Sequence, residues 1–192
     1  MIAGLGNPGK TYEATRHNIG FDVLRALAAK HRLSFHDKLK WKASVAEGKV
    51  GDADVILMMP LTFMNDSGAA VAPVFQYWGV DLSRLLVIVD DIAIAIGQLR
   101  MRTDSSSGGQ NGLKSVEEHL QTNHFARLRI GVGDRKEGDL ASHVLGRFSQ
   151  EEQQLVPKIL ERAVTAIEIW LEKGLNHAMD FANRPSNPGS VQ

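Results

Sequence analysis

The sequence predicts a single α/β domain. Short apolar runs typical of strands alternate along the chain with segments of helical periodicity. One of these runs, Leu85–Val89, is apolar at every position, as expected of a central strand buried on both faces. The length of 192 residues suits one domain with a full-sized core, and no internal repeat is present. Together these three observations place the chain in the α/β class.

The first part of the chain is expected to form a strand, a helix and a hairpin. A strand at Ile2–Leu5 leads through a polar loop to a helix at about Ile19–His31, whose apolar residues are spaced for one buried face. The β-favouring runs Ser44–Val50 and Asp54–Met59 flank the turn dipeptide Gly51-Asp52. This arrangement predicts a β-hairpin.

A loop over residues 60–68 follows the hairpin, and a helix follows the loop. Asp66 or Ser67 can cap that helix at its N-terminus. Pro73 lies inside the helix and should kink it or shorten its first turn. The buried strand at Leu85–Val89 comes next and ends in the acidic pair Asp90-Asp91.

The second half of the chain continues the alternation. It is expected to contain a strand at Leu99–Arg102, a helix at about Leu113–Leu120, an alternating strand at Phe125–Val132 and a long amphipathic helix at about Gln150–Lys173. A short helix ending at Asn183 closes the domain, which we assign to residues 1–183. Residues 184–192 are rich in Pro, Ser and Asn and are expected to form a disordered tail.

Composition excludes several classes of function. The 22 basic and 22 acidic residues balance, which argues against indiscriminate nucleic-acid binding through a globally positive surface. The chain has no cysteine, so disulfides and thiolate metal sites are excluded. No apolar run approaches the roughly 20 residues that span a bilayer, and no signal peptide is visible. We therefore expect a cytoplasmic protein without a membrane partner.

A polar loop separates the first strand from the first helix, a place where α/β proteins often carry their chemistry. Its hydrogen-bonding side chains include Asn7, Tyr12, Arg16, His17 and Asn18. Residues 4–9 also fit G-x-G-x-x-G, the dinucleotide fingerprint. That fingerprint requires a helix opening at the glycines, whereas helical periodicity begins only near Ile19. A dinucleotide site is therefore disfavoured.

Three other features could meet this loop at one rim of the sheet: the strand end Asp90 and the segments Met64-Asn65 and Gly109–Gly112. Such a site favours hydrolysis by an activated water. Histidine is the usual general base, a carboxylate orients it, and asparagine can donate to a developing oxyanion. Covalent serine chemistry and a zinc site lack their motifs. The same residues also fit a surface histidine, a helix cap and ordinary turns.

Two strand segments carry an Arg-x-Arg pattern, Arg100-Met101-Arg102 and Arg127-Leu128-Arg129. Because residues two apart share one face of a strand, each segment presents two guanidinium groups on one side. The spacing alone leaves two interpretations. The arginines form either a solvated sheet edge that guards against aggregation or a local phosphate site.

Several longer motifs make the chain similar to a known family. They are Gly4–Gly9, Tyr12, Thr15–Gly20, Thr62–Gly68, Gly108–Ser115, Phe125–Gly133, Val144–Phe148 and Gly174–Met179. With these motifs in order over nearly its whole length, the chain resembles bacterial-type peptidyl-tRNA hydrolases. The resemblance implies a monomer with a mixed twisted sheet, surrounded by helices. The sheet is expected to have about six or seven strands and a mostly parallel core.

The resemblance also implies an activity and its catalytic residues. The expected reaction is hydrolysis of the ester that joins a peptide to the terminal ribose of tRNA, without metal or cofactor and with peptidyl-tRNA as the partner. His17 corresponds to the general base and Asp90 to its orienting carboxylate. Asn7 corresponds to a neighbour of the base that places substrate or water. Asn111 corresponds to a group that positions water or donates to the oxyanion.

Further positions correspond to substrate contacts. Asn65, with Met64, matches the lining of the peptide channel, and Tyr12 matches a residue at the cleft near the tRNA end. The family's clamp for the 5′-phosphate of tRNA corresponds to Arg102 and Arg129. This resemblance favours the phosphate interpretation of the arginines, since guanidinium suits bidentate phosphate binding.

The sequence departs from the family pattern in three places. Gln110 stands where histidine is usual, Ile92–Ile96 replaces an acidic, proline-bearing turn, and the approach to Asn111 is rich in serine. An alternative function is a non-catalytic RNA-binding module on the same scaffold, of the kind that assists splicing. The matching catalytic positions are all present, which favours the enzyme.

Overall fold

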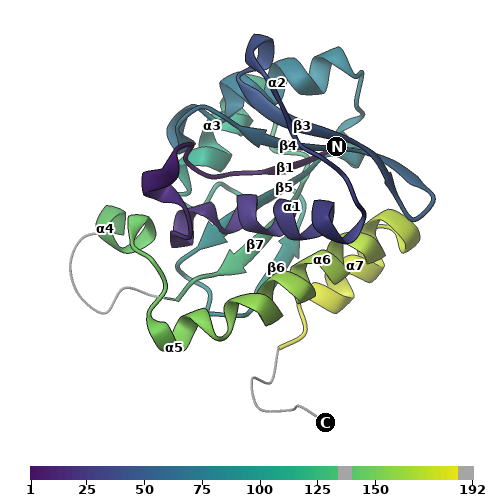
Figure 1. The fold of residues 1–192 in the computed structure, drawn as a ribbon. Helices are drawn as coiled ribbons and strands as arrows, with labels where there is room; N and C mark the ends of the chain where they lie inside the picture. The colour runs from purple at the N-terminus through teal and green to yellow at the C-terminus, as the bar shows by residue number, and fades with distance from the viewer. Residues whose placement is uncertain (134–139, 186–192) are drawn as a thin grey trace.

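A seven-stranded mixed sheet runs through the centre of the protein, with helices on both of its faces (Figure 1). The structure is a computed structural model that describes residues 1–133 and 140–185. In chain order, the strands are β1 (Ile2–Gly4), β2 (His36–Lys38), β3 (Ala43–Val50), β4 (Ala53–Pro60), β5 (Leu86–Asp91), β6 (Leu99–Arg102) and β7 (Ala126–Gly131). Residues 186–192 of the expected tail lie outside the described part of the chain.

The strands are arranged in the order β2-β3-β4-β1-β5-β7-β6. β4, β1, β5 and β7 run parallel to one another, whereas β2, β3 and β6 are antiparallel to their neighbours. This arrangement confirms the predicted mixed sheet with a mostly parallel core. The carboxyl ends of β1, β4 and β5 therefore lie at the same edge of the sheet, where the polar loops begin.

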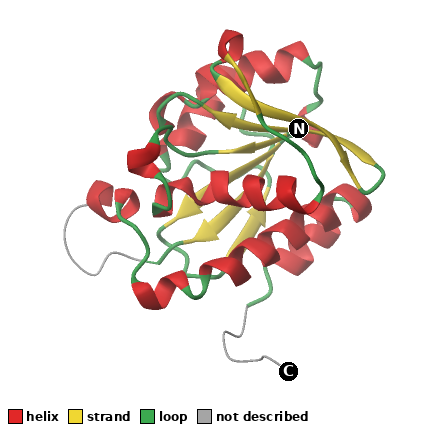
Figure 2. Ribbon diagram, viewed as in Figure 1, coloured by secondary structure: helices red, strands yellow, loops and turns green. Residues whose placement is uncertain are grey.

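Two hydrophobic clusters lie on opposite faces of the sheet, between its strands and the helices that Figure 2 shows in red. Alternate residues of β5 belong to different clusters: Leu86 and Ile88 to one, Val87 and Val89 to the other. The first face is covered by α1 (Ile19–Lys30), α6 (Val156–Lys173) and α7 (Leu175–Ala182), and the second by α2 (Gly68–Tyr77) and α3 (Asn111–Leu120). Because both faces are covered, β5 can be apolar from Leu86 to Val89, before it ends in Asp90 and Asp91.

Most predicted elements are confirmed with small shifts of their ends. The expected hairpin is formed by β3 and β4, which pair antiparallel up to Val50 and Ala53. β2 was not predicted, because its three residues are all exposed and show no apolar alternation. Among the described residues, no helix is both long and apolar enough to cross a membrane.

The long helix expected at Gln150–Lys173 is wrong, because the structure divides it into α5 (Gln150–Gln153) and α6. Pro157 lies in the first turn of α6, where its missing N–H costs no helical hydrogen bond. Ser149 begins α5 with a capping box, in which Glu152 is the reciprocal partner. A short helix, α4 (Leu140–Leu145), precedes these two elements.

The predicted side-chain cap of α2 is also wrong. Ser67 occupies the N-cap position, but its hydroxyl donates to the carbonyl of Met64 at 2.8 Å. The N–H of Gly68 donates instead to Oγ of Ser115 on α3, at 3.0 Å. A Cβ at Gly68 would overlap with the carbonyl oxygen of Ser115, so glycine allows α2 and α3 to approach closely. The helix continues past Pro73 to Tyr77.

Candidate functional site

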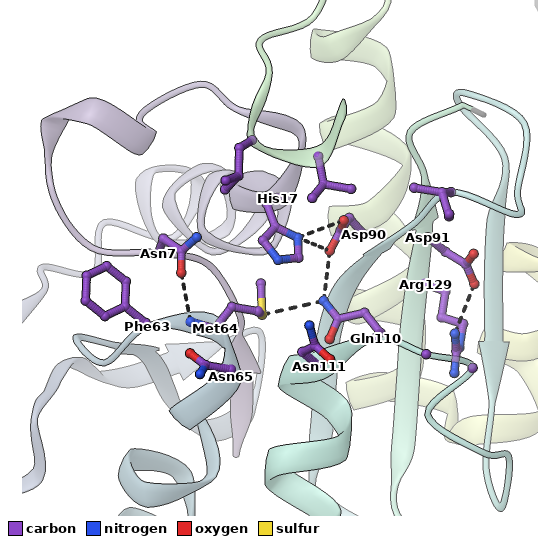
Figure 3. A pocket seen from close by; sticks show the side chains of 15 residues that line it. Asn7, His17, Phe63, Met64, Asn65, Asp90, Asp91, Gln110, Asn111 and Arg129 are labelled. Atoms are coloured by element: carbon purple, nitrogen blue, oxygen red, sulfur yellow. Dashed lines mark hydrogen bonds and ion pairs between the residues drawn. The ribbon is translucent and has the colours of Figure 1, made fainter. Parts of the chain in front are cut away.

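A pocket of about 560 Å³ opens at the carboxyl ends of the central parallel strands (Figure 3). Its lining includes seven of the site residues predicted from the sequence, namely Asn7, His17, Met64, Asn65, Asp90, Asn111 and Arg129. The structure thus brings together the loops after β1, β4 and β5 and the start of α3. Two predicted residues, Tyr12 and Arg102, are not part of this lining.

His17 is held between two buried neighbours in a short 3-10 helix, η2 (Arg16–Asn18). The guanidinium of Arg16 donates to the carbonyl of Arg147 and to Oε2 of Glu152, and it lies over the ring of Phe148 at 5.1 Å. On the other side, the Asn18 side chain exchanges hydrogen bonds with the backbone of Asn7, at 2.8 and 2.9 Å. These anchors fix the backbone that carries His17.

The imidazole of His17 contacts the carboxylate of Asp90, the fifth residue of β5. Nδ1 of His17 lies 2.9 Å from both Oδ1 and Oδ2 of Asp90, although the residues are 73 positions apart. The Asp90 side chain is 3% exposed and that of His17 is 13% exposed. Figure 3 shows the second ring nitrogen of His17 directed toward the interior of the pocket. A carboxylate on one ring nitrogen favours the tautomer in which the other nitrogen is a free acceptor.

Asn7 connects the β1 loop to the β4 loop. Its side-chain oxygen accepts from the backbone N–H of Met64 at 2.7 Å. Its side-chain nitrogen is directed toward the side of the pocket that holds His17 (Figure 3). Because the oxygen is occupied, Asn7 offers the pocket a donor rather than an acceptor.

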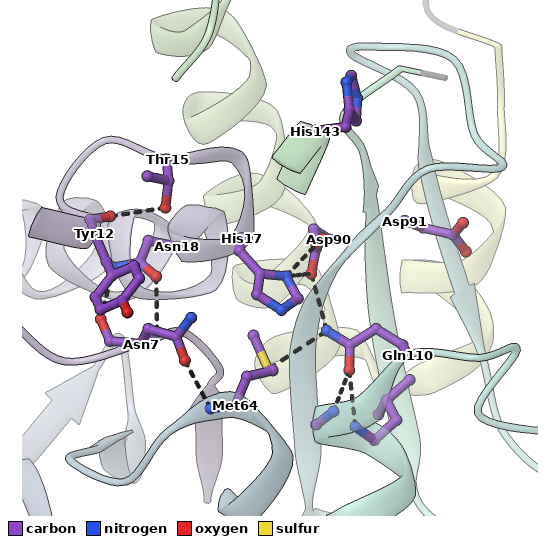
Figure 4. Close-up of polar contacts among 12 residues, drawn as sticks. Asn7, Tyr12, Thr15, His17, Asn18, Met64, Asp90, Asp91, Gln110 and His143 are labelled. Carbon is purple, nitrogen blue, oxygen red and sulfur yellow. Dashed lines mark hydrogen bonds and ion pairs between the residues drawn. The ribbon is translucent and has the colours of Figure 1, made fainter. Parts of the chain in front are cut away.

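Gln110 is a site residue whose contacts the sequence did not reveal. Its side-chain oxygen accepts from the N–H groups of Gly112 and Leu113, so it caps α3, while its nitrogen donates to Oδ1 of Asp90 at 2.9 Å (Figure 4). The helix was expected to start at Leu113 but starts at Asn111. A correct helix start would have identified Gln110 as the cap. Nothing in the local sequence indicates its contact with Asp90.

The arginines of β6 and β7 share one face of the sheet. Arg100 lies opposite Arg129, and Arg102 lies opposite Arg127. Arg102 is exposed on the edge strand β6. The interpretation as a solvated edge is wrong for β7, where Arg127 is 0% and Arg129 is 7% exposed.

These two arginines are buried because β7 lies inside the sheet, between β5 and β6. Arg127 pairs with Glu117 of α3 at 3.0 Å and donates to the carbonyls of Ser105 and Asn123. Burial lowers the pKa of Arg127, and the neighbouring Glu117 carboxylate opposes that shift. The predicted alternation of this strand is likewise wrong, since all six residues of β7 are buried.

Asp91 holds Arg129 at the edge of the pocket. One carboxylate oxygen accepts from Arg129 at 3.0 Å, and the other accepts from the backbone N–H of Ala93 at 2.8 Å. Arg129 also donates to the carbonyl of Ser106 at 2.6 Å. The apolar segment that begins at Ile92 is thereby fixed beside the pocket, and Ile92 contributes to its wall.

The rim of the pocket opposite Arg129 is aromatic (Figure 3). Phe63 is 58% exposed and lines the pocket. Tyr12 packs edge to face against Phe63, with ring centroids 6.2 Å apart, so it lies just outside the lining. Within residues 1–133 and 140–185, no group of three or more His, Cys, Asp or Glu side chains is arranged to hold a metal ion.

Comparisons with known proteins agree with the motifs. A family model described as peptidyl-tRNA hydrolase matches residues 1–189. A peptidyl-tRNA hydrolase of Alkaliphilus oremlandii is 46% identical over 183 residues, which cover 95% of this chain and 98% of that protein. A peptidyl-tRNA hydrolase of Gloeobacter violaceus is 44% identical over 187 residues, which cover 97% of this chain and 94% of that protein.

A solved structure extends this similarity to three dimensions. The crystal structure of peptidyl-tRNA hydrolase from Acinetobacter baumannii matches with a TM-score of 0.90 at 32% sequence identity. The match covers 95% of this chain and 93% of that one.

Proposed function

The chain belongs to the peptidyl-tRNA hydrolase family, and from this premise we propose that it hydrolyses the ester of peptidyl-tRNA with water activated by His17. One observation carries the proposal for the residues: Nδ1 of His17 lies 2.9 Å from both carboxylate oxygens of Asp90, and both residues line the pocket described above. An imidazole oriented in this way is poised to take a proton through its other nitrogen.

In the proposed reaction, Nε2 of His17 removes a proton from a water molecule as its oxygen attacks the ester carbonyl. The imidazolium that forms is stabilised by the Asp90 carboxylate. The tetrahedral intermediate then collapses, the bond to the ribose oxygen breaks, and His17 returns the proton to that oxygen. The products are a peptide with a free carboxyl group and a tRNA with a free ribose hydroxyl.

Two carboxamides are proposed to assist this step. The side-chain nitrogen of Asn7 is available as a donor because the oxygen of the same group already accepts from Met64. Asn111 begins α3 and lines the pocket, so it is suited to position the water or to donate to the oxyanion. The N-terminus of α3 adds a favourable dipole for developing negative charge.

Substrate contacts are proposed on either side of His17. Met64 and Asn65 are assigned to the peptide, and Tyr12, which packs on Phe63 at the rim, is assigned to the tRNA end. Arg102 and Arg129 are assigned to the tRNA phosphate. Arg129 already pairs with Asp91, so the exposed Arg102 is expected to supply most of the charge.

The test follows ester cleavage of an N-acetylated aminoacyl-tRNA. His17→Ala should lower kcat by roughly 10²–10⁴-fold while the thermal midpoint stays near that of the native protein. His36→Ala, which removes an exposed histidine on the edge strand β2, is the matched control. A folded His17→Ala variant with near-native turnover would remove His17 from the mechanism. Binding of tRNA without cleavage by the native protein would favour the RNA-binding alternative.

Three further expectations accompany this proposal. The reaction is expected to need no metal, so a chelator should leave the rate unchanged, and a rate restored only by added metal would contradict this. A monomeric state and a cytoplasmic location remain predictions from the sequence. Assignment of residues 1–183 to the catalytic domain is likewise proposed.

A further inference from the structure

We infer that Gln110 is a positioning residue, whose side chain fixes the Asp90 carboxylate to the N-terminus of α3 and thereby holds the proposed base and Asn111 in one unit. This inference rests on the proposed function. The side chain of Gln110 contacts the end of β5, the loop after β4 and the start of α3 (Figure 4).

The two ends of the Gln110 amide face opposite kinds of partner. Its nitrogen donates to Oδ1 of Asp90 at 2.9 Å and faces Sδ of Met64 at 3.5 Å. Its oxygen accepts from the N–H groups of Gly112 and Leu113, at 2.6 and 3.0 Å. Rotating the amide by half a turn would place oxygen against a carboxylate and nitrogen against two donors. The four contacts therefore allow one orientation only.

The orientation of the Asp90 carboxylate therefore depends on Gln110 as well as on His17. Its carboxylate contacts His17 through both oxygens and accepts from Gln110 through Oδ1, so a second donor holds its direction while His17 gains or loses a proton. A carboxamide has no charge to lose, so it donates at every pH at which the protein is folded. A Cβ at Gly112 would lie 3.0 Å from Oε1 of Gln110, so the glycine leaves room for this arrangement.

Substitution by glutamate separates the two roles of Gln110. The carboxylate of Gln110→Glu can still accept from Gly112 and Leu113 at a helix N-terminus, so the cap should be retained. Toward Asp90 it presents an acceptor and a charge instead of a donor. We therefore expect the acid limb of the kcat–pH profile to move to higher pH by roughly one unit.

Two other variants complete the experiment. Gln76→Glu makes the same chemical change at an exposed position on α2 and should leave the profile unmoved. Gln110→His offers a ring N–H that can donate to Asp90, and it should keep kcat within roughly threefold of the native value. The cleavage assay uses the full chain and an N-acetylated aminoacyl-tRNA.

The outcomes distinguish this inference from the proposed function. A Gln110→Glu profile that coincides with the native one, or an equal shift in Gln76→Glu, would overturn the positioning role. A native protein without ester cleavage would refute the proposed function instead. In that case the titration of the His17 ring, followed by NMR in native protein and both Gln110 variants, still tests the contact: an unchanged titration midpoint in Gln110→Glu would refute it. If Gln110→Glu does not fold, Gln110→His decides, since a large loss of kcat in a folded protein would contradict donation to Asp90.

Discussion

Replacing Asp90 by asparagine tests the proposed mechanism most directly, because it removes a charge and almost no volume. In the native protein, the carboxylate faces two donors, Nδ1 of His17 and Nε2 of Gln110, each at 2.9 Å. An asparagine keeps an oxygen in the place of Oδ1, which accepts in both contacts, but its NH₂ group replaces Oδ2, the second acceptor of His17. In the proposed mechanism, the imidazolium of His17 also loses its counter-charge.

The expected loss of rate follows from the attraction between the imidazolium of His17 and the carboxylate of Asp90. Two unit charges about 4 Å apart, near a protein surface, attract each other by about 4 kcal/mol. Each 1.36 kcal/mol of transition-state stabilisation is about tenfold in rate, so complete loss corresponds to roughly 10³-fold. The remaining oxygen of asparagine still accepts hydrogen bonds, and we therefore expect kcat to fall by roughly 10²–10³-fold. The affinity for substrate should change little, since the charge develops only in the transition state.

The assay is single-turnover cleavage of an N-acetylated aminoacyl-tRNA with enzyme in excess, which separates chemistry from product release. Asp54→Asn is the matched control, because Asp54 is 85% exposed and pairs with Lys49 next to the hairpin turn. Thermal unfolding reports whether the Asp90 variant keeps its fold. A folded Asp90→Asn protein with a single-turnover rate within threefold of the native rate would refute the reasoning.

Three further predictions concern tRNA binding and stability. Arg102→Ala should weaken tRNA binding and reduce the slope of log Kd against log salt by about 1. The control Lys49→Ala, beside the hairpin turn, should change neither the affinity nor the slope. Equal slopes for the native protein and both variants would contradict a phosphate contact. Gly68→Ala should lower the free energy of unfolding by about 1–3 kcal/mol, because the new Cβ meets the rigid carbonyl of Ser115. Gly112→Ala should lower the free energy of unfolding by less, because two of the atoms nearest to the new Cβ belong to the flexible side chains of Met64 and Leu5. Urea denaturation in which Gly112→Ala loses more stability than Gly68→Ala would refute this. For Glu168, burial alone raises the pKa, but hydrogen bonds from Lys30 and His31 outweigh it and hold the pKa below the usual 4.5. The contribution of Glu168 to stability is therefore present above pH 4.5 and lost below it. At pH 7 Glu168→Gln should have a lower free energy of unfolding than the native protein, and this difference should shrink as the pH falls below 4.5. A difference that stays constant with pH in urea titrations would contradict this.

The sequence alone determined the elements that depend on local patterns. The continuous apolar run of β5 indicated a strand covered on both faces, and the 3.6-residue spacing after Ile19 indicated α1. The turn dipeptide at Gly51-Asp52 predicted the hairpin. These features are local because hydrophobic periodicity and turn chemistry are properties of a few neighbouring residues.

The site residues were predicted partly from local patterns and partly from the family motifs. Polar loops at strand ends suggested that His17 and Asp90 could meet, because the carboxyl ends of parallel strands share one edge of a sheet. Family motifs then assigned roles to these residues and to Asn7, Asn65 and Asn111. Sequence could not give the 2.9 Å contact between His17 and Asp90, since that distance depends on how Arg16 and Asn18 anchor the loop.

Only the tertiary structure decided the environment of the charged and polar side chains. Arg102 and Arg129 occupy similar Arg-x-Arg patterns, yet one is exposed on an edge strand and the other is buried against Asp91, because strand order is not written in local spacing. The position of Gln110 between Asp90 and α3 is a long-range contact of the same kind. Pattern along the chain therefore fixed which elements form, whereas packing between distant elements fixed which side chains meet, because burial and hydrogen bonding depend on neighbours in space.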